Sequence, residues 1–210
     1  YQGYLSLAAS GREQPMSTHA DRYSFNSGYG ISAYSKGAVF LAQLGYVIGQ
    51  DKLMESLRRY FDDFKFKHPT PNDFIRSAEK VSGMELEWYL LDWTQTTNTI
   101  DYGVKGVDAD GSGTRISLER LGLMPMPVDL LVVLKDGTQK VYYLPLRMMR
   151  GGKENPYSGI DWDVMPDWTW AQKEYALQID VPKEQIQAIL IDPSQLMADV
   201  NPENNGWMAE

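Results

Sequence analysis

The spacing of apolar residues changes near residue 100, and this change constrains the fold more than any other feature of the sequence. Before it, apolar residues recur every three or four positions, as on one face of an α-helix. After it, they alternate with polar residues, as on a β-strand. With 210 residues and 43% hydrophobic composition, the chain can bury a substantial core. The sequence predicts an α+β protein of two domains, with helices in residues 1–102 and a small antiparallel β-sandwich in 103–210.

Helical spacing extends from Ser32 to Trp93 and predicts four segments. The first places Tyr34 in its first turn, in register with the apolar face. It is expected to end at Gly49, because glycine is the preferred residue just past a helix. Asp51 is then predicted to cap the second helix.

The third and fourth helices have clearer boundaries. Thr70, Pro71 and Asp73 form a helix start signal in which Thr70 is the cap and proline takes the first helical position. Gly83 is expected to close this helix. The fourth segment, 86–93, is apolar almost all round, so we expect it to be buried.

The second half contains short alternating runs separated by turn residues. Asp136-Gly137 is a strong hairpin signal between two of these runs. Strands are predicted around Ile116 and Leu118, over 128–134 and 141–146, around Tyr175 to Ile179, and over 189–191.

The segment 147–170 has neither period and is rich in Gly, Pro and Trp, so we interpret it as a long packed loop. Its Trp162, Trp168 and Trp170 have two possible uses. We favour packing between the two halves of the chain over a surface for a partner.

Composition argues against several classes of function. A net charge of −8 disfavours nucleic acid as a partner, since phosphate binding relies on clustered Lys and Arg. No apolar run is long enough to predict a membrane-spanning segment. The absence of cysteine suits a reducing cytosol and also an envelope protein without disulfides. The compartment stays open, with a periplasmic, envelope or secreted location slightly favoured.

Common catalytic signatures are missing from the sequence. There is no H-E-x-x-H, no G-x-S-x-G, no P-loop and no G-x-G-x-x-G. The two histidines, His19 and His68, have no further ligand at zinc-binding spacing on a predicted helix. We therefore predict that the chain binds no metal itself.

The segment from Tyr23 to Leu44 reads Y-S-F-N-S-G-Y-G-I-S-A-Y-S-K-G-A-V-F-L-A-Q-L. It resembles the part of the gluzincin zinc aminopeptidases, peptidase family M1, that follows their zinc-binding helices. The resemblance is carried by Tyr34-Ser35-Lys36-Gly37, by the second tyrosine Tyr29 five residues earlier, and by further matches over 18–102. A weaker likeness to the β-sandwich that follows the catalytic domain continues through Asp192-Pro193.

This resemblance implies specific roles. The Tyr34 hydroxyl would stabilise the oxyanion of a zinc-bound tetrahedral intermediate while amino-terminal residues are removed from peptides. For Tyr29 two interpretations stay open, a residue that lines the substrate site and a packing residue. We interpret Lys36 as structural. Zinc in the parent protein would be held by ligands outside this chain, whose partners would be the peptide substrate and the rest of the catalytic domain. The chain begins with Tyr1, and we expect a fragment that is inactive alone.

Three alternatives stay open. From periodicity alone, a tyrosine at the position of Tyr34 is more often a core residue with a satisfied hydroxyl. The chain as a whole is alternatively a non-catalytic module that binds protein or peptide. A pseudoenzyme of the same fold would keep Tyr34 but lack zinc ligands.

Overall fold

The computed structural model describes residues 1–209, which form two compact units. The helical unit contains Tyr1–Thr99 together with Met148–Glu154, and the β-rich unit contains Ile100–Arg147 and the chain from Asn155 onward. Helices and sheets are thus segregated along the sequence, which confirms the predicted α+β class.

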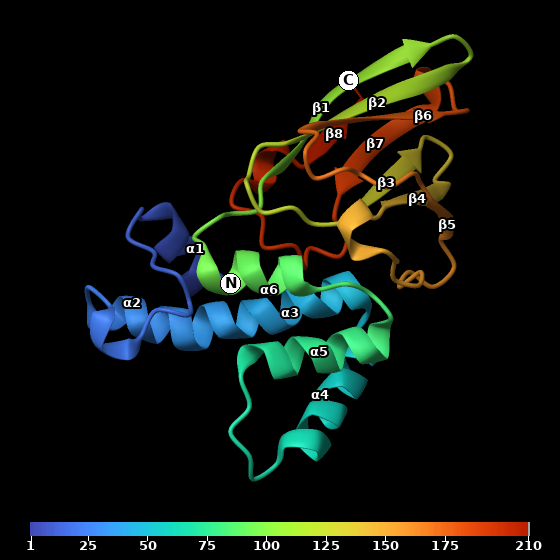
Figure 1. The fold of residues 1–210 in the computed structure, drawn as a ribbon. Helices are drawn as coiled ribbons and strands as arrows, with labels where there is room; N and C mark the ends of the chain where they lie inside the picture. The colour runs from blue at the N-terminus through green and yellow to red at the C-terminus, as the bar shows by residue number, and fades with distance from the viewer. Residues whose placement is uncertain (210) are drawn as a thin grey trace. The chain divides into compact units, whose positions relative to one another are not determined.

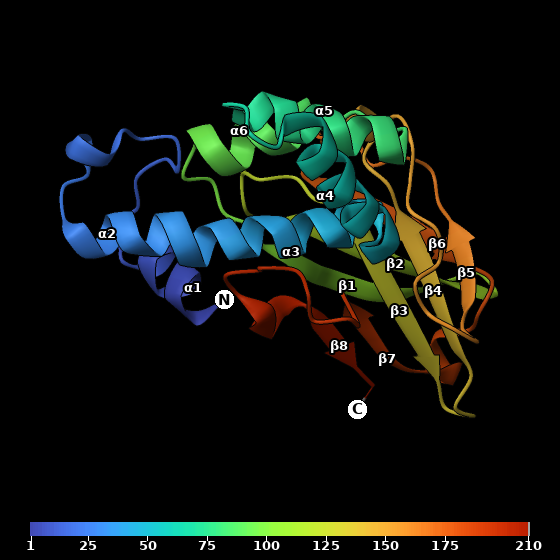
Figure 2. The same cartoon turned by 90° about the horizontal axis from the view of Figure 1, so that it is seen from below.

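Six α-helices and one π-helical segment make up most of the helical unit (Figure 1). The π segment continues directly from α2 into α3, so the three form one unbroken helix, best seen in Figure 2. The elements are α1 Gln2–Ala9, α2 Asn26–Gly30, the π segment Ile31–Lys36, α3 Gly37–Ile48, α4 Gln50–Phe64, α5 Pro71–Ser82 and α6 Glu87–Gln95.

The helix boundaries agree in part with the prediction. Gly49 ends α3 as expected, but at φ 93° it passes the chain directly into α4. Asp51 therefore lies in the first turn of α4. The prediction that Asp51 caps this helix is wrong, because Gly49 occupies the cap position. At α5 the prediction is confirmed, because Thr70 and Asp73 form a reciprocal capping box and Gly83 closes the helix with φ 72°.

The first predicted helix begins earlier than expected, at Asn26, and α1 was not predicted at all. The polar, glycine-containing stretch of α2 shows little apolar periodicity, and its helical form depends on packing against other parts of the unit.

Aromatic rings fill the core of the helical unit. The Phe40 ring centroid lies 5.1 Å from that of Tyr89 and 6.4 Å from that of Trp93, and Tyr4 of α1 packs on Trp93 at 5.5 Å. Such tilted and edge contacts add to the free energy gained by burying the rings. The expectation that 86–93 is buried all round is wrong at Leu91, which is 50% exposed.

One piece of the segment 147–170 packs into the helical unit. The Met149 carbonyl accepts a hydrogen bond from the Glu85 backbone N–H at 2.9 Å. The buried Lys153 donates to the Tyr46 carbonyl at 3.0 Å, and its ammonium lies 3.8 Å from the Tyr46 ring centroid. These contacts explain why Met148–Glu154 belongs with the helices although strands flank it in sequence.

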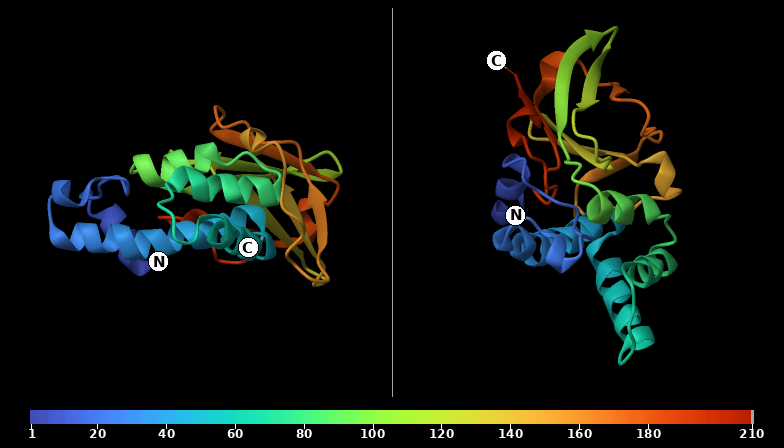
Figure 3. Two further views of the ribbon diagram at one scale, coloured as in Figure 1. Left: turned by 60° about the horizontal axis from the view of Figure 1, so that its bottom comes forward. Right: turned by 60° about the vertical axis from the view of Figure 1, so that its left-hand side comes forward.

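Helices α4 and α5 pack against each other as neighbours in sequence (Figure 3). No helix in residues 1–209 is long and apolar enough to cross a membrane.

The β-rich unit has two sheets, one in the order β1-β2-β6 and one in the order β5-β4-β3-β7-β8. All pairs are antiparallel except β4 with β5, so the all-antiparallel prediction is wrong at this edge. The strands are β1 Tyr102–Asp110, β2 Gly113–Arg120, β3 Val128–Leu134, β4 Gln139–Leu144, β5 Asp161–Val164, β6 Glu174–Ile179, β7 Ile186–Ile191 and β8 Gly206–Met208.

The predicted hairpin at Asp136-Gly137 joins β3 to β4, and Gly137 adopts φ 89° as such a turn requires. Three strands were missed: β1, β5 and β8. Strands β5 and β8 are only four and three residues long, and the burial of β1 does not alternate regularly, so none of the three shows a sustained period of two. Pairing with neighbouring strands gives them their structure.

The three tryptophans of 147–170 have different environments and do not form a cluster on the surface. Trp168 is buried within the β-rich unit against Tyr102 and Tyr175. Trp162 stacks on Tyr143, with ring centroids 4.9 Å apart. The long-loop interpretation is also wrong over 161–164, which forms β5.

Asp199 joins the chain before β1 to the carboxy-terminal segment. Its carboxylate accepts hydrogen bonds from the backbone N–H groups of Tyr102 at 2.9 Å and Asn201 at 2.8 Å. Burial, only partly offset by these bonds, raises the pKa of Asp199 to about 6. Between the ordinary pKa of 3.8 and about 6, the folded state therefore holds a proton on Asp199 that the unfolded state has already released.

We predict that the wild type gains stability relative to Asp199→Asn as the pH falls from about 6 toward the ordinary value of 3.8. In this window the native state binds more protons than the unfolded state, so the contribution of Asp199 to the free energy of unfolding rises as pH falls. Urea denaturation at several pH values measures the difference. Asp108→Asn, an exposed change on β1, is the control, and equal pH slopes for wild type and Asp199→Asn would contradict the assignment.

Candidate active site

The two tyrosines singled out in the sequence lie on the α2, π and α3 helix. Tyr29 is in α2 and is 45% exposed, and Tyr34 is in the π segment and is 80% exposed. The predicted register of Tyr34 with the apolar face is wrong, and so is its placement in a first helical turn. The alternative in which Tyr34 is a core residue is excluded within residues 1–209.

Polar residues occupy the buried positions of this helix, and this explains the wrong register. Ser32, Lys36 and Gln43 are fully buried, and the apolar Val39 and Phe40 between them in sequence are buried as well. A pattern of apolar residues cannot reveal a core-facing side that is partly polar. Tyr34 and Ala38 instead fall on the exposed side.

The π segment changes the angular relation between Tyr29 and Tyr34. In a regular α-helix, residues five apart are about 140° apart around the axis. A π-helix forms hydrogen bonds across five residues and so brings residues with this spacing closer to one side. Both side chains are exposed, and the segment that joins them is the only π-helix in residues 1–209.

Lys36, two residues after Tyr34, forms a buried ion pair with Glu13. The Lys36 ammonium is 2.6 Å from a Glu13 carboxylate oxygen, and the two side chains are 0% and 4% exposed. Lys36 also reaches the Thr96 carbonyl at 3.5 Å. The pair therefore connects the π segment with the chain between α1 and α2, and with the end of α6.

The surroundings of this pair are both aromatic and polar. The Lys36 ammonium lies 5.8 Å from the ring centroids of Tyr4 and Trp93. The buried Tyr4 Oη, Ser32 Oγ and Trp93 Nε1 have no hydrogen-bond partner among residues 1–209. Burial, and next the negative charge of Glu13, raise the pKa of Tyr4 far above its ordinary value, so its phenol stays protonated.

Tyr29 has a partly packed ring. Its centroid lies 5.4 Å from that of Tyr23, whose hydroxyl donates to the Pro15 carbonyl at 3.1 Å. The Tyr29 ring is thus covered by Tyr23 in part, and the rest of the side chain is exposed.

The described residues offer no metal site. Among residues 1–209 no group of three or more His, Cys, Asp and Glu side chains lies close enough to hold an ion. His19 is exposed and accepts a hydrogen bond from the Asp21 backbone N–H at 3.3 Å, and His68 lies in the exposed turn before α5.

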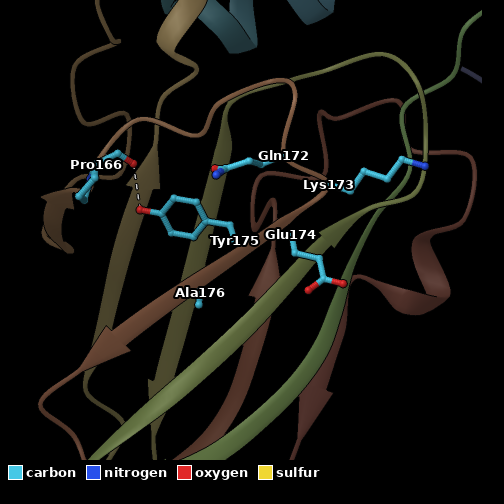
Figure 4. Close-up of a pocket in the computed structure, with 6 residues that line it drawn as sticks. All are labelled: Pro166, Gln172, Lys173, Glu174, Tyr175 and Ala176. Atoms are coloured by element: carbon cyan, nitrogen blue, oxygen red, sulfur yellow. Dashed lines mark hydrogen bonds between the residues drawn. The ribbon is translucent and has the colours of Figure 1, made fainter.

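A shallow hollow in the β-rich unit lies beside β6 and is shown in Figure 4. Tyr175 points toward Pro166 there and donates to its carbonyl at 2.9 Å, while Lys173 extends away from Tyr175. Glu174 is paired with Lys105 at the surface. These groups form no acid and base pair around a common point, so this hollow is not a candidate active site.

Residues 2–93 match the model of the peptidase family M1 domain. This match covers α1 to α6, including Tyr29, Tyr34 and the Lys36–Glu13 pair. The helical part of the chain is therefore similar to the peptidase family M1 domain.

Individual relatives agree with this assignment. The chain is 26% identical to the probable aminopeptidase 2 of Sulfurisphaera tokodaii over 60% of its length, and 24% identical to the probable aminopeptidase 1 of Saccharolobus solfataricus over 63%. The chain spans only 14% and 15% of these two proteins.

A solved structure has a similar fold. The chain matches the crystal structure of Legionella pneumophila aminopeptidase A in complex with aspartic acid with a TM-score of 0.56 and 16% identity. The match covers 95% of this chain and 21% of that one. At this identity the likeness supports the fold alone.

The two tyrosines were singled out from the sequence, but Glu13 was not. No local pattern links Glu13 to Lys36, which is 23 residues further on. The available signal was a lysine inside an otherwise core-facing helical stretch, since a lysine is almost never fully buried unless it is paired.

We predict that Lys36→Met destabilises the protein by about 3–5 kcal/mol, because it leaves the Glu13 carboxylate buried and unpaired. Glu13→Met/Lys36→Met removes both charges and should recover most of this loss. Urea denaturation measures both variants. Lys105→Met breaks an exposed ion pair and should cost no more than about 1 kcal/mol. A similar, small loss for Lys36→Met would contradict the importance of burial.

We also predict that the 210-residue chain retains no stoichiometric zinc, because its described residues bring no three ligands together. Metal analysis after dialysis is the measurement. A His19→Ala/His68→Ala variant is the control for weak surface binding by the two histidines. One tightly held zinc per untagged chain would overturn the prediction.

Proposed function

We propose that this chain provides the tyrosine-bearing side of an aminopeptidase active site and forms the carboxy-terminal part of the catalytic domain together with a β-sandwich. The carrying observation is that Tyr34 of the Tyr-Ser-Lys-Gly motif is 80% exposed on a helix anchored by a buried ion pair. The match of residues 2–93 to the M1 domain and the names of the relatives support this function.

In this proposal the Tyr34 hydroxyl is the oxyanion donor. Addition of water to the first peptide bond turns the planar carbonyl into a tetrahedral intermediate, and its oxygen takes up negative charge. A phenol O–H aimed at the position of that oxygen stabilises the transition state more than the ground state. A rigid helix suits this task, since the donor must be in place before charge develops.

The metal requirement of such an enzyme is not met by the described residues. No three suitable ligands converge in 1–209. In our proposal the zinc ion that the M1 resemblance implies is held by ligands outside this chain, so the chain alone does not hydrolyse peptides. Its partners are then the rest of the catalytic domain and the peptide substrate.

Tyr29 has a supporting role in this proposal. Its open side lies five residues before Tyr34 on the same helix, and its other side packs on Tyr23. This placement suits a residue that lines the substrate site.

The test removes a single oxygen atom. In the intact protein that contains this chain, Tyr34→Phe should lower kcat and kcat/KM together by about 100- to 1000-fold with KM nearly unchanged, because the lost hydrogen bond forms mainly in the transition state. Hydrolysis of amino-terminal peptide substrates is measured under steady-state conditions. The free energy of unfolding should change little, since the Tyr34 ring is exposed.

Two control variants accompany this experiment. Tyr29→Phe should reduce kcat less than Tyr34→Phe, and Tyr60→Phe on α4 should leave it unchanged. An active parent in which Tyr34→Phe keeps wild-type kcat would eliminate Tyr34 as the oxyanion donor. A parent without peptidase activity would favour the binding-module or pseudoenzyme alternative.

A further inference from the structure

One short loop holds both ends of the helical stretch that carries Tyr29 and Tyr34. Residues 12–15, which we call the Arg12–Pro15 loop, lie between α1 and α2. Just before α2, the Arg12 guanidinium lies 4.1 Å from the Phe25 ring centroid. The Gln14 side chain accepts a hydrogen bond from the Ser24 backbone N–H at 2.7 Å.

The same loop holds the far end of the stretch through charge. Glu13 lies between Arg12 and Gln14, and its carboxylate binds the Lys36 ammonium at the last position of the π segment. The helix from Asn26 to Lys36 is therefore fixed at its start by Arg12 and Gln14 and at its end by Glu13. Tyr29 and Tyr34 lie between these two points.

The contact with α1 adds a third restraint. A Cβ on Gly3 would lie 2.9 Å from Ser35 Oγ, so α1 approaches the π segment as closely as a residue without a side chain permits. Ser35 is the residue between Tyr34 and Lys36. The backbone next to Tyr34 is thus packed against α1 at Ser35.

These restraints select the π register over a regular α-helix. A return to α-helical hydrogen bonding would turn the start of the stretch by about 100° relative to α3, since each residue of an α-helix turns the chain by that angle. The loop could not then keep both its contacts at Ser24 and Phe25 and its ion pair with Lys36. Glu13 or Lys36 would be left buried and uncompensated, which is strongly unfavourable.

We propose that Glu13 and Lys36 are positioning residues, whose buried ion pair fixes the π-helical register and thereby the direction of the Tyr34 hydroxyl. This inference rests on the proposed function of Tyr34. It adds that catalysis needs the helical register that the ion pair fixes, and not only the stability that the pair contributes. Neither residue contacts the substrate.

The test uses the intact protein and separates positioning from stability. Glu13→Met/Lys36→Met removes both charges but keeps side chains of similar length, so the protein stays folded. Because a misplacement of about 1 Å can cost 100-fold in rate, kcat should fall by about 10- to 100-fold with KM nearly unchanged. Lys105→Met/Glu174→Met removes an exposed ion pair of the same kind and should leave kcat as it is.

A double-mutant cycle with Tyr34→Phe tests whether the ion pair affects kcat through the Tyr34 hydroxyl. If the pair acts through the Tyr34 hydroxyl, adding Glu13→Met/Lys36→Met to Tyr34→Phe should cause no further loss of kcat. A purely structural role predicts that the two losses multiply. Multiplied losses, or wild-type kcat in a folded Glu13→Met/Lys36→Met protein, would overturn the inference.

A second measurement does not depend on activity. The 210 residues contain no cysteine, so a nitroxide label on Tyr34→Cys reports this one position once any cysteine elsewhere in the protein is replaced. Electron paramagnetic resonance should show a more mobile or split spectrum in Glu13→Met/Lys36→Met than with the pair intact. An unchanged spectrum would refute positioning, whereas a changed spectrum with Tyr34→Phe at wild-type kcat would refute only the proposed catalytic role.

Discussion

The buried ion pair between Lys36 and Glu13 organises the helical unit. Its desolvation is costly, and it is tolerated only because the two charges meet at 2.6 Å and Lys36 has a further acceptor in the Thr96 carbonyl. Three parts of the chain must come together to satisfy these groups: the loop after α1, the π segment and the end of α6. An apolar contact could slide by one residue, but a buried charge pair cannot.

This constraint accounts for the unusual combination of buried and exposed residues around the motif Tyr34-Ser35-Lys36-Gly37. Lys36 points into the core, while Tyr34, two residues earlier, is exposed. The motif therefore places a buried, ion-paired lysine and an exposed tyrosine hydroxyl within one helical turn.

The β-rich unit follows simpler rules. Buried and less buried residues alternate in β2 and in the second half of β6, which pairs with β2, and the Asp136-Gly137 turn joins β3 to β4. The segment between β4 and β6 crosses between units, since Met148–Glu154 packs with the helices and Asp161–Val164 returns as the parallel strand β5. A buried carboxylate, Asp199, joins the chain before β1 to the carboxy-terminal segment.

Local chemistry alone was sufficient for the α+β class, the capping box at Thr70 and the Gly49 and Gly83 helix ends, whereas Tyr29 and Tyr34 were singled out by the family resemblance of their motif. Each of these depends on residues within a few positions of one another. The start of α2, strand β5, the exposed side of α3 and the Glu13–Lys36 pair were decided only by the tertiary structure. The physical reason is that buried polar groups take their places from partners far away in sequence, so neither periodicity nor spacing can show which of them faces the core.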